Sequence, residues 1–180
     1  MANGAVDRRF DPRDPHDLEQ LLTLYRSSLI FFIQRLVGDP DIAEDLAIDS
    51  FLELLVHPLR YNGRSSIKTY LFMIGRSKAL KYLKRRSRIS QEPLPEDHPD
   101  DTSLEEQFLA DERRRALHSV LNTLPEEMRA AVHLVYFEEL SYRQTAQVLK
   151  KTEKQVDNLL YRAKAALRTQ LGKDDLFEKP

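Results

Sequence analysis

The chain has 180 residues, 41% of them apolar, which is enough material for one ordinary globular domain or two small ones. The absence of cysteine excludes disulfide bonds, thiolate zinc sites and a thiol nucleophile. The sequence shows no basic and apolar leader, and its longest dense apolar patch, 29–33, is too short to span a bilayer, so we expect a cytoplasmic protein that does not insert into membranes. The net charge of −1 hides a segregation of sign along the chain, so local charge decides which partners each segment suits.

Residues 1–15 form an N-terminal tail, and the first predicted helix follows it. Its apolar residues recur at helical spacing until Gly38 ends the pattern: Leu18, Leu21, Leu22, Tyr25, Leu29, Phe32, Ile33 and Leu36. Asp39 is a suitable N-cap for the next helix, and Pro40 suits the first position of that helix. Because the sequence also lacks the alternation typical of β-strands, we predict an all-α fold.

The predicted helix at 41–56 is apolar on two sides. One stripe consists of Ala43, Ala47, Phe51 and Leu54. The opposite stripe, edged by acidic side chains, consists of Ile48, Leu52 and Leu55 with Asp45 and Asp49. The helix is therefore either sandwiched inside its own bundle or carries a protein-docking surface with an acidic rim.

A third helix is predicted to follow the turn at 61–64 and to begin near Ser65 or Ser66. Its second half is basic and contains no acid: Arg76, Lys78, Lys81, Lys84, Arg85, Arg86 and Arg88. From 92 to 106 every charged residue is acidic, and prolines are interleaved, which predicts an extended linker. The predicted organisation is a helical domain at 16–88, a linker at 89–103, a second helical domain at 104–172 and a C-terminal tail at 173–180.

The second domain contains two helix-start signals eleven residues apart. Ser141 with Gln144, and Thr152 with Gln155, have the spacing of a capping box. The short joint between the helices favours a helix-turn-helix. On a helical wheel the second helix has an apolar side, formed by Val156, Leu160, Ala163 and Leu167, and a polar side, formed by Lys154, Asn158, Tyr161 and Arg162. This pattern fits either a recognition helix in a DNA groove or a capped hairpin within a helical bundle.

Three segments, in this order, resemble an extracytoplasmic-function sigma factor, a member of the sigma-70 family (group 4) that gives bacterial RNA polymerase its promoter specificity. They are DIAEDLAIDSFLELL, YNGRSSIKTYLFMIGRSKALKYLKRR and LSYRQTAQVL followed by VDNLLYRAKAALR. The first is similar to the family's AED-L-x-Q-x-x-F segment, the second to its F-x-G-x-S-x-x-T-W-L segment and the third to its C-terminal helix-turn-helix. The resemblance covers nearly the whole chain.

The resemblance implies a role for each segment. The family's docking helix binds the clamp helices of the polymerase β′ subunit, and the matching residues here are Asp45, Ile48, Asp49, Leu52 and Leu55. The following loop and helix would hold the melted minus-ten element through Tyr61, Asn62, Gly63, Arg64, Arg76, Ser77, Lys78, Lys81, Lys84 and Arg85. The C-terminal domain would contact the β flap and read minus-35 duplex DNA through Ser141, Lys151, Thr152, Lys154, Gln155, Asn158, Tyr161 and Arg162. An anti-sigma factor is an expected further partner.

Some positions depart from the family pattern. Ile48 stands where the family has Gln, Tyr70 where it has Trp, and Ser77 where it has Asn. A hydroxyl offers fewer hydrogen bonds than an amide, so the base recognised near Ser77 does not follow from the resemblance. In the recognition helix the usual Val-Lys-Ser-Arg is replaced by residues 156–159, Val-Asp-Asn-Leu. The promoter sequence is therefore not predicted.

Other classes of protein make different demands on the sequence. A helix-turn-helix regulator that acts without polymerase would share the C-terminal domain but would not need the segment at 61–88. An anti-sigma factor or adaptor should lack a cationic helix. The histidines show no paired metal-ligand spacing, and no glycine-rich phosphate loop is present, so we expect neither an enzyme nor a cofactor. We expect each histidine to be either solvated or hydrogen-bonded within the fold; they are His16, His57, His98, His118 and His133.

Overall fold

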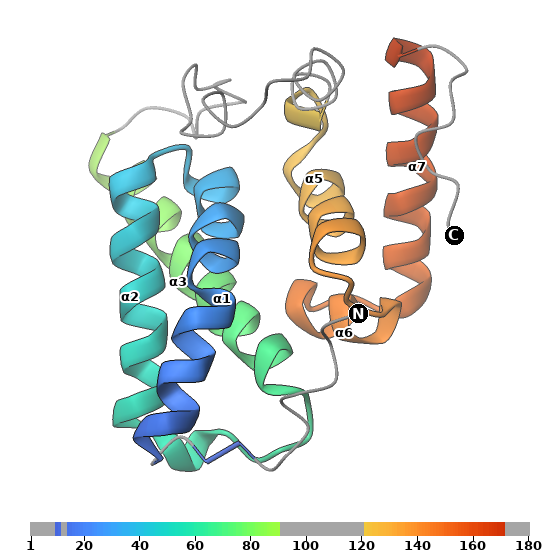
Figure 1. The fold of residues 1–180 in the computed structure, drawn as a ribbon. Helices are drawn as coiled ribbons and strands as arrows, with labels where there is room; N and C mark the ends of the chain where they lie inside the picture. Colours follow the sequence, from blue (N-terminus) through green and yellow to red (C-terminus); the bar gives the residue numbers. More distant parts are fainter. Residues whose placement is uncertain (1–9, 12–13, 91–120, 172–180) are drawn as a thin grey trace.

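The structure is a computed structural model that describes residues 10–11, 14–90 and 121–171 (Figure 1). In chain order they form α1 (Pro15–Val37), α2 (Pro40–Val56), the 3-10 helix η1 (Pro58–Arg60), α3 (Ile67–Ser90), α5 (Glu126–Val132), the π-helical turn η2 (His133–Phe137), α6 (Tyr142–Leu149) and α7 (Glu153–Leu171). No strand occurs in this described part, and the predicted all-α fold is confirmed. The acidic segment 92–106, His98, His118 and the C-terminal tail lie outside it.

Local capping interactions set the ends of the N-terminal helices. Gly38 ends α1 with a φ of 75°, a left-handed conformation that glycine adopts without strain. Asp39 caps α2 by accepting a hydrogen bond from the backbone amide of Ile42 at 3.0 Å, as predicted. Ser66 caps α3 in the same way, accepting from the amide of Thr69 at 3.1 Å. The predicted starts of α2 and α3 are therefore confirmed.

The first three helices pack into a bundle. Its core contains Phe32 and Phe72, whose ring centroids lie 5.3 Å apart. Gly75 allows α3 to approach α1 closely, because a Cβ atom at that position would lie 2.8 Å from Cδ1 of Leu29. Residues from α2 complete this core, and they are the stripe Ala43, Ala47, Phe51 and Leu54.

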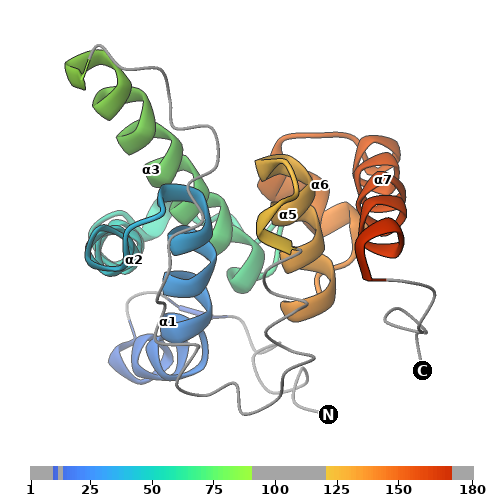
Figure 2. The same cartoon turned by 90° about the horizontal axis from the view of Figure 1, so that it is seen from above.

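The C-terminal helices form a second group, in which α5 and α6 both pack on α7. Both predicted capping boxes are present: the side chains of Ser141 and Gln144 bond each other's backbone amides, and those of Thr152 and Gln155 do the same. The turn between α6 and α7 is tight because Lys150 adopts a left-handed φ of 53°. Figure 2 shows this group beside the first, with α7 on the side away from α1–α3.

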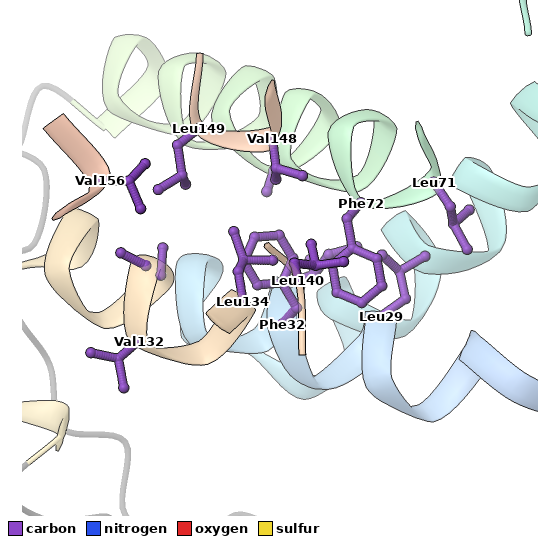
Figure 3. Close-up of a cluster of buried hydrophobic side chains, with 14 of the residues drawn as sticks. Leu29, Phe32, Leu71, Phe72, Val132, Leu134, Leu140, Val148, Leu149 and Val156 are labelled. Atoms are coloured by element: carbon purple, nitrogen blue, oxygen red, sulfur yellow. The ribbon is translucent and has the colours of Figure 1, made fainter. Parts of the chain in front are cut away.

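The two groups of helices share one continuous core, which sequence patterns do not predict. Contacts join α3 to α6 and α1 to α5. In Figure 3, Phe32 and Phe72 of the first group lie against Leu134 and Leu140 of the second. Val148 on α6 belongs to the same buried cluster. The two predicted domains are thus packed against each other in this structure.

His133 lies in this shared core and is therefore buried, not solvated. Its ring stacks near Phe31 and Phe32 of α1, with centroid distances of 6.1 and 5.6 Å. Its Nε2 lies 3.4 Å from Oε1 of Glu138. Burial lowers the pKa of His133 below 6.5; Glu138 opposes the shift, and the positive charge of Arg35 adds to it.

Acidification should weaken the fold through His133. Because its folded pKa is lowered, the unfolded chain binds more protons between that value and 6.5, and the free energy of unfolding falls as the pH falls below 6.5. The slope from one such group is at most about 1.4 kcal/mol per pH unit. Chemical denaturation from about pH 7.5 to about pH 5.5 measures the slope.

His133→Leu should flatten that dependence, whereas the exposed His57→Leu should keep the wild-type slope. Glu138 reduces the free energy of unfolding only when the pH falls below about 4.5. Burial would raise its pKa, but the neighbouring His133 and Lys68 outweigh burial and hold it below 4.5. An unchanged slope in His133→Leu would contradict the assignment.

Candidate docking and nucleic-acid surfaces

The second apolar stripe of α2 is exposed. Ile48, Leu52 and Leu55 have exposed fractions of 45%, 48% and 45%, and Asp45 and Asp49 beside them are exposed as well. The described residues of the chain do not cover this stripe, so the alternative of a helix sandwiched in its own bundle does not hold there. A contiguous apolar surface with an acidic rim is typical of a protein-docking site.

This surface extends past the end of α2, which the sequence reasoning missed. Val56 is 64% exposed and Leu59, in η1, is 81% exposed. An ion pair between Arg60 and Glu53 ties η1 back to α2. The signal was available in the sequence, because the apolar pattern continues through residues 54–59, but Pro58 breaks the helical periodicity on which the stripe was defined.

The loop after η1 holds Tyr61 in a defined position. Its hydroxyl donates a hydrogen bond to the carbonyl oxygen of Ser65 at 2.9 Å, and its ring lies 5.3 Å from that of Tyr70. Phe10 makes an edge contact with the same ring at 6.3 Å, a neighbour that no sequence pattern indicated. The half-buried ring of Tyr61 is therefore positioned by contacts on two sides, which suits a stacking platform.

The Tyr61 loop has further internal order. Asn62 accepts a hydrogen bond from the amide of Arg64 at 3.1 Å, and Gly63 has a φ of 72°. Burial raises the pKa of Tyr70 above 10.0, and the nearby charge of Glu53 acts in the same direction. The side chains of Asn62 and Arg64 are exposed, so the loop presents polar donors next to the aromatic pair.

The basic residues predicted to contact DNA do not all lie on one surface of α3. Of the residues predicted to contact DNA, those exposed along its second half are Ser77, Lys81, Lys84 and Arg85. Lys78 is half-buried, and its Nζ lies 3.9 Å from a carboxylate oxygen of Glu53. Arg76 is only 8% exposed, and its charge acts on Glu126 at the start of α5. Burial raises the pKa of Glu126, and the charge of Arg76 opposes this. The predicted set is therefore divided between DNA-accessible and buried positions.

The polar side of α7 is exposed as predicted. Val156, Leu160, Ala163 and Leu167 are buried, whereas the exposed side chains are Lys154, Asn158, Tyr161 and Arg162. Leu159, one of the departures from the family pattern, is also buried. This arrangement presents an amide and two cations near the N-terminal half of a helix, which suits contact with base edges and phosphates.

The polar groups at the start of the two helices have structural roles. Ser141, Thr152 and Gln155 form the capping boxes. Lys151 pairs with Glu127 of α5, with 2.8 Å between Nζ and a carboxylate oxygen. The Lys151 side chain is 20% exposed and that of Glu127 is 47% exposed, so the pair is only partly accessible to solvent. These residues shape the helix-turn-helix whether or not they also contact a ligand.

The described residues contain no group of three or more His, Asp or Glu side chains placed to hold a metal ion. Within 10–11, 14–90 and 121–171 we also find no helix long and apolar enough to cross a membrane. The geometry that stands out is instead an exposed apolar stripe, a row of exposed cations and a capped helix-turn-helix.

Comparison with known protein families assigns both groups of helices. Residues 21–89 match the model for sigma-70 region 2, and residues 114–167 match the model for sigma-70 region 4. Together these ranges cover more than half of the chain. The first range contains the α2 stripe and the Tyr61 loop, and the second contains the helix-turn-helix.

Full-length relatives and solved structures agree with this assignment. A probable RNA polymerase sigma factor of Haemophilus influenzae is 28% identical over 176 residues, covering 87% of this chain and 90% of the relative. The ECF RNA polymerase sigma factor SigM of Bacillus subtilis is 22% identical over 154 residues, covering 84% and 93%. The fold is similar to that of the sigma factor RpoE solved with the anti-sigma factor NepR from Bartonella quintana, with a TM-score of 0.72, 23% identity, and coverage of 88% of this chain and 99% of that one. The chain belongs to the extracytoplasmic-function group of the sigma-70 family of RNA polymerase sigma factors.

Proposed function

We propose that this sigma factor binds core RNA polymerase through the exposed stripe of α2, melts the minus-ten element with the domain at 16–88, and reads the minus-35 duplex with the helix-turn-helix. It acts in the cytoplasm, where the polymerase is, and has no catalytic role of its own. The β′ clamp helices are the partner of α2, and the β flap is the partner of the C-terminal domain.

The observation that carries the proposal is the exposure of Ile48, Leu52 and Leu55. A regulator that bound duplex DNA alone would have no use for an uncovered apolar stripe on a helix remote from its recognition helix. Neither would it need exposed cations on α3 together with a positioned aromatic pair at Tyr61 and Tyr70. A factor that docks on polymerase and holds single-stranded DNA uses all of these features.

The two DNA surfaces suit different forms of DNA. Tyr61 offers a ring for stacking on an extruded base, while Lys81, Lys84 and Arg85 offer charges for a single-stranded backbone. On α7, Asn158 has an amide that can pair with the N6 and N7 atoms of adenine, and Arg162 can pair with a guanine edge or a phosphate. Lys154 lies at the helix start and is suited to a phosphate.

An anti-sigma factor is a further proposed partner. The likeness in fold to RpoE, which was solved in complex with the anti-sigma factor NepR, supports this proposal. An apolar docking stripe that is exposed in the free chain is the kind of surface that an inhibitor would cover to prevent binding to polymerase.

Leu52→Asp should abolish co-purification with core polymerase, because it places a charge in the centre of the α2 stripe. Loss of a central apolar contact costs about 2 kcal/mol or more, equivalent to at least about thirtyfold in Kd. The melting temperature of the free variant should stay close to that of the wild type, since Leu52 is exposed.

Leu24→Asp is the matched control for Leu52→Asp. Leu24 is 50% exposed on α1, outside the stripe, so the same substitution there should leave polymerase binding intact. Equal binding by both variants would exclude the stripe as the docking surface, and unfolding of Leu52→Asp alone would show that its side chain is internal.

Tyr61→Ala should impair opening of the minus-ten element without changing duplex binding by the helix-turn-helix. The lost base stacking is worth about 1–3 kcal/mol. Tyr61→Phe keeps the ring and loses only the hydrogen bond to Ser65, so it should retain most of the activity. Permanganate reactivity of minus-ten thymines measures opening, and wild-type reactivity in Tyr61→Ala would remove this ring from the mechanism.

Asn158→Ala and Lys154→Ala should affect transcription from promoter variants in different ways: the first should change base preference, and the second should change overall affinity. Loss of a base-reading amide should cost about 1–3 kcal/mol on the cognate site and flatten the preference at one position. Loss of a phosphate contact should weaken all sites alike and reduce the salt slope by about one. Transcription from minus-35 variants at several salt concentrations separates the two effects. Intact base preferences in Asn158→Ala would show that α7 does not read DNA through that residue.

A further inference from the structure

The residues just before α1, predicted as part of an N-terminal tail, are fixed to the start of that helix. The amide of Asp11 donates a hydrogen bond to Oδ2 of Asp17 at 2.9 Å, and the amide of Asp14 donates to the backbone carbonyl of Asp11 at 2.9 Å. Asp14 in turn caps α1 by accepting from the amide of His16 at 2.9 Å. Phe10 directly precedes this hydrogen-bonded turn, so its backbone has a defined place beside the bundle.

Three aromatic residues are in contact next to this turn. The ring of Phe10 meets that of Tyr61 at an interplanar angle of 80°, with 6.3 Å between the centroids, and Tyr61 in turn contacts Tyr70. All three side chains are half-buried and pack against the core. Because the planes of Phe10 and Tyr61 are nearly perpendicular, neither ring covers the other face to face. We call these two partly exposed rings the aromatic corner.

The aromatic corner suits a flat aromatic ligand. A planar group that stacks on one ring of the corner meets the other ring edge to face, and both arrangements are favourable between aromatic groups. Unpaired nucleobases bind to proteins by such stacking, largely without regard to their sequence. The corner therefore offers an unpaired base two contacts where Tyr61 alone offers one.

The charges beside the two rings differ in sign. Arg64 follows Tyr61 in the loop and is exposed, whereas Asp11 and Asp14 follow Phe10 and are exposed as well. A phosphate is attracted to the guanidinium group and repelled by the carboxylates. A single strand that crosses the corner would therefore keep its backbone near the loop and point a base toward Phe10.

We propose that Phe10 is a second base-stacking residue of the minus-ten site, and that it holds one unpaired base of the melted element together with Tyr61. This inference rests on the proposed function, because it adds a residue to the surface formed by the Tyr61 loop. It extends that surface to a segment that precedes the domain predicted at 16–88.

Two other roles of Phe10 have different consequences. A residue that only packs against Tyr61 and the core needs apolar volume but no aromatic ring. A residue that covers Tyr61 in the free chain hinders base stacking, so its removal would promote opening of the DNA. Variants that change the ring and the volume of Phe10 separately distinguish these roles from base stacking.

Permanganate reactivity of minus-ten thymines tests the proposal, with the full chain, core polymerase and a promoter from which the wild type initiates. Phe10→Ala should lower the equilibrium constant for opening by about fivefold or more, because one stacking contact is lost. Phe10→Leu keeps apolar volume but no ring, and should lower it to a similar extent. Phe10→Tyr keeps the ring and should stay close to the wild type.

Leu24→Ala is the control for truncation of an apolar side chain in the same part of the chain. Leu24 is 50% exposed on α1, and its truncation should leave opening unchanged. A photo-crosslink tests the contact itself and does not depend on the stability of Phe10→Ala. In the open complex, p-benzoylphenylalanine in place of Phe10 should crosslink to the minus-ten element, and the same group in place of Leu24 should not.

Several outcomes would overturn the proposal. Wild-type opening by Phe10→Leu would show a packing role, opening above the wild type in Phe10→Ala would show a cover over Tyr61, and a missing crosslink from position 10 would show that no base lies there. Impaired opening in Tyr61→Ala with normal opening in every Phe10 variant would exclude Phe10 and leave the proposed function standing. Failure of the wild-type chain to support polymerase-dependent initiation would instead contradict the proposed function, and this inference with it.

Discussion

A helix of 17 residues that is apolar on two sides cannot bury both of them against a bundle that lies on one side of it. In α2 the small and aromatic stripe of Ala43, Ala47 and Phe51 is the one that packs on α1 and α3, because alanines let the helices approach. The larger side chains of Ile48, Leu52 and Leu55 are left in solvent. Each can contribute about 1.5–3 kcal/mol when a partner buries it, and this gain would drive the proposed docking on polymerase.

The two surfaces proposed to bind DNA differ in the form of DNA that they suit. Stacking on Tyr61 needs an unpaired base and tolerates any base, whereas hydrogen bonding by Asn158 needs the major groove of an intact duplex and distinguishes bases. Local contacts position each surface: Tyr61 contacts Ser65 and Tyr70, and α7 begins with a complete capping box. If the proposed roles of Tyr61 and Asn158 hold, one chain would bind duplex DNA and melted DNA at separate sites.

Features that depend on neighbouring residues in the sequence were predictable. The caps at Asp39, Ser141 and Thr152, the two stripes of α2 and the polar side of α7 all follow from helical periodicity or from side chains that bond nearby amides. The residues proposed to touch polymerase and DNA came instead from the resemblance to a family, and their roles stay predictions.

Features that depend on distant residues were not predictable. Lys68 and Glu138 are 70 positions apart, and nothing around either residue indicates the other. Arg76 belongs to a basic run that reads as a solvated surface, yet it is buried. His133 has no local pattern that distinguishes it from an exposed histidine, and Phe10 lies beside Tyr61 only because the chain returns to that loop. Long-range packing leaves no periodic signal in a single sequence.

Transcription reconstituted from purified chain, core polymerase that lacks any sigma factor and a genomic DNA library tests the central claim most directly. Sequencing the transcript starts identifies which promoters are used. A sigma factor should give initiation that depends on both the chain and the core enzyme, at starts that share two sequence blocks upstream. Binding of a dimer to a palindromic site in the absence of polymerase, with no such initiation, would contradict it.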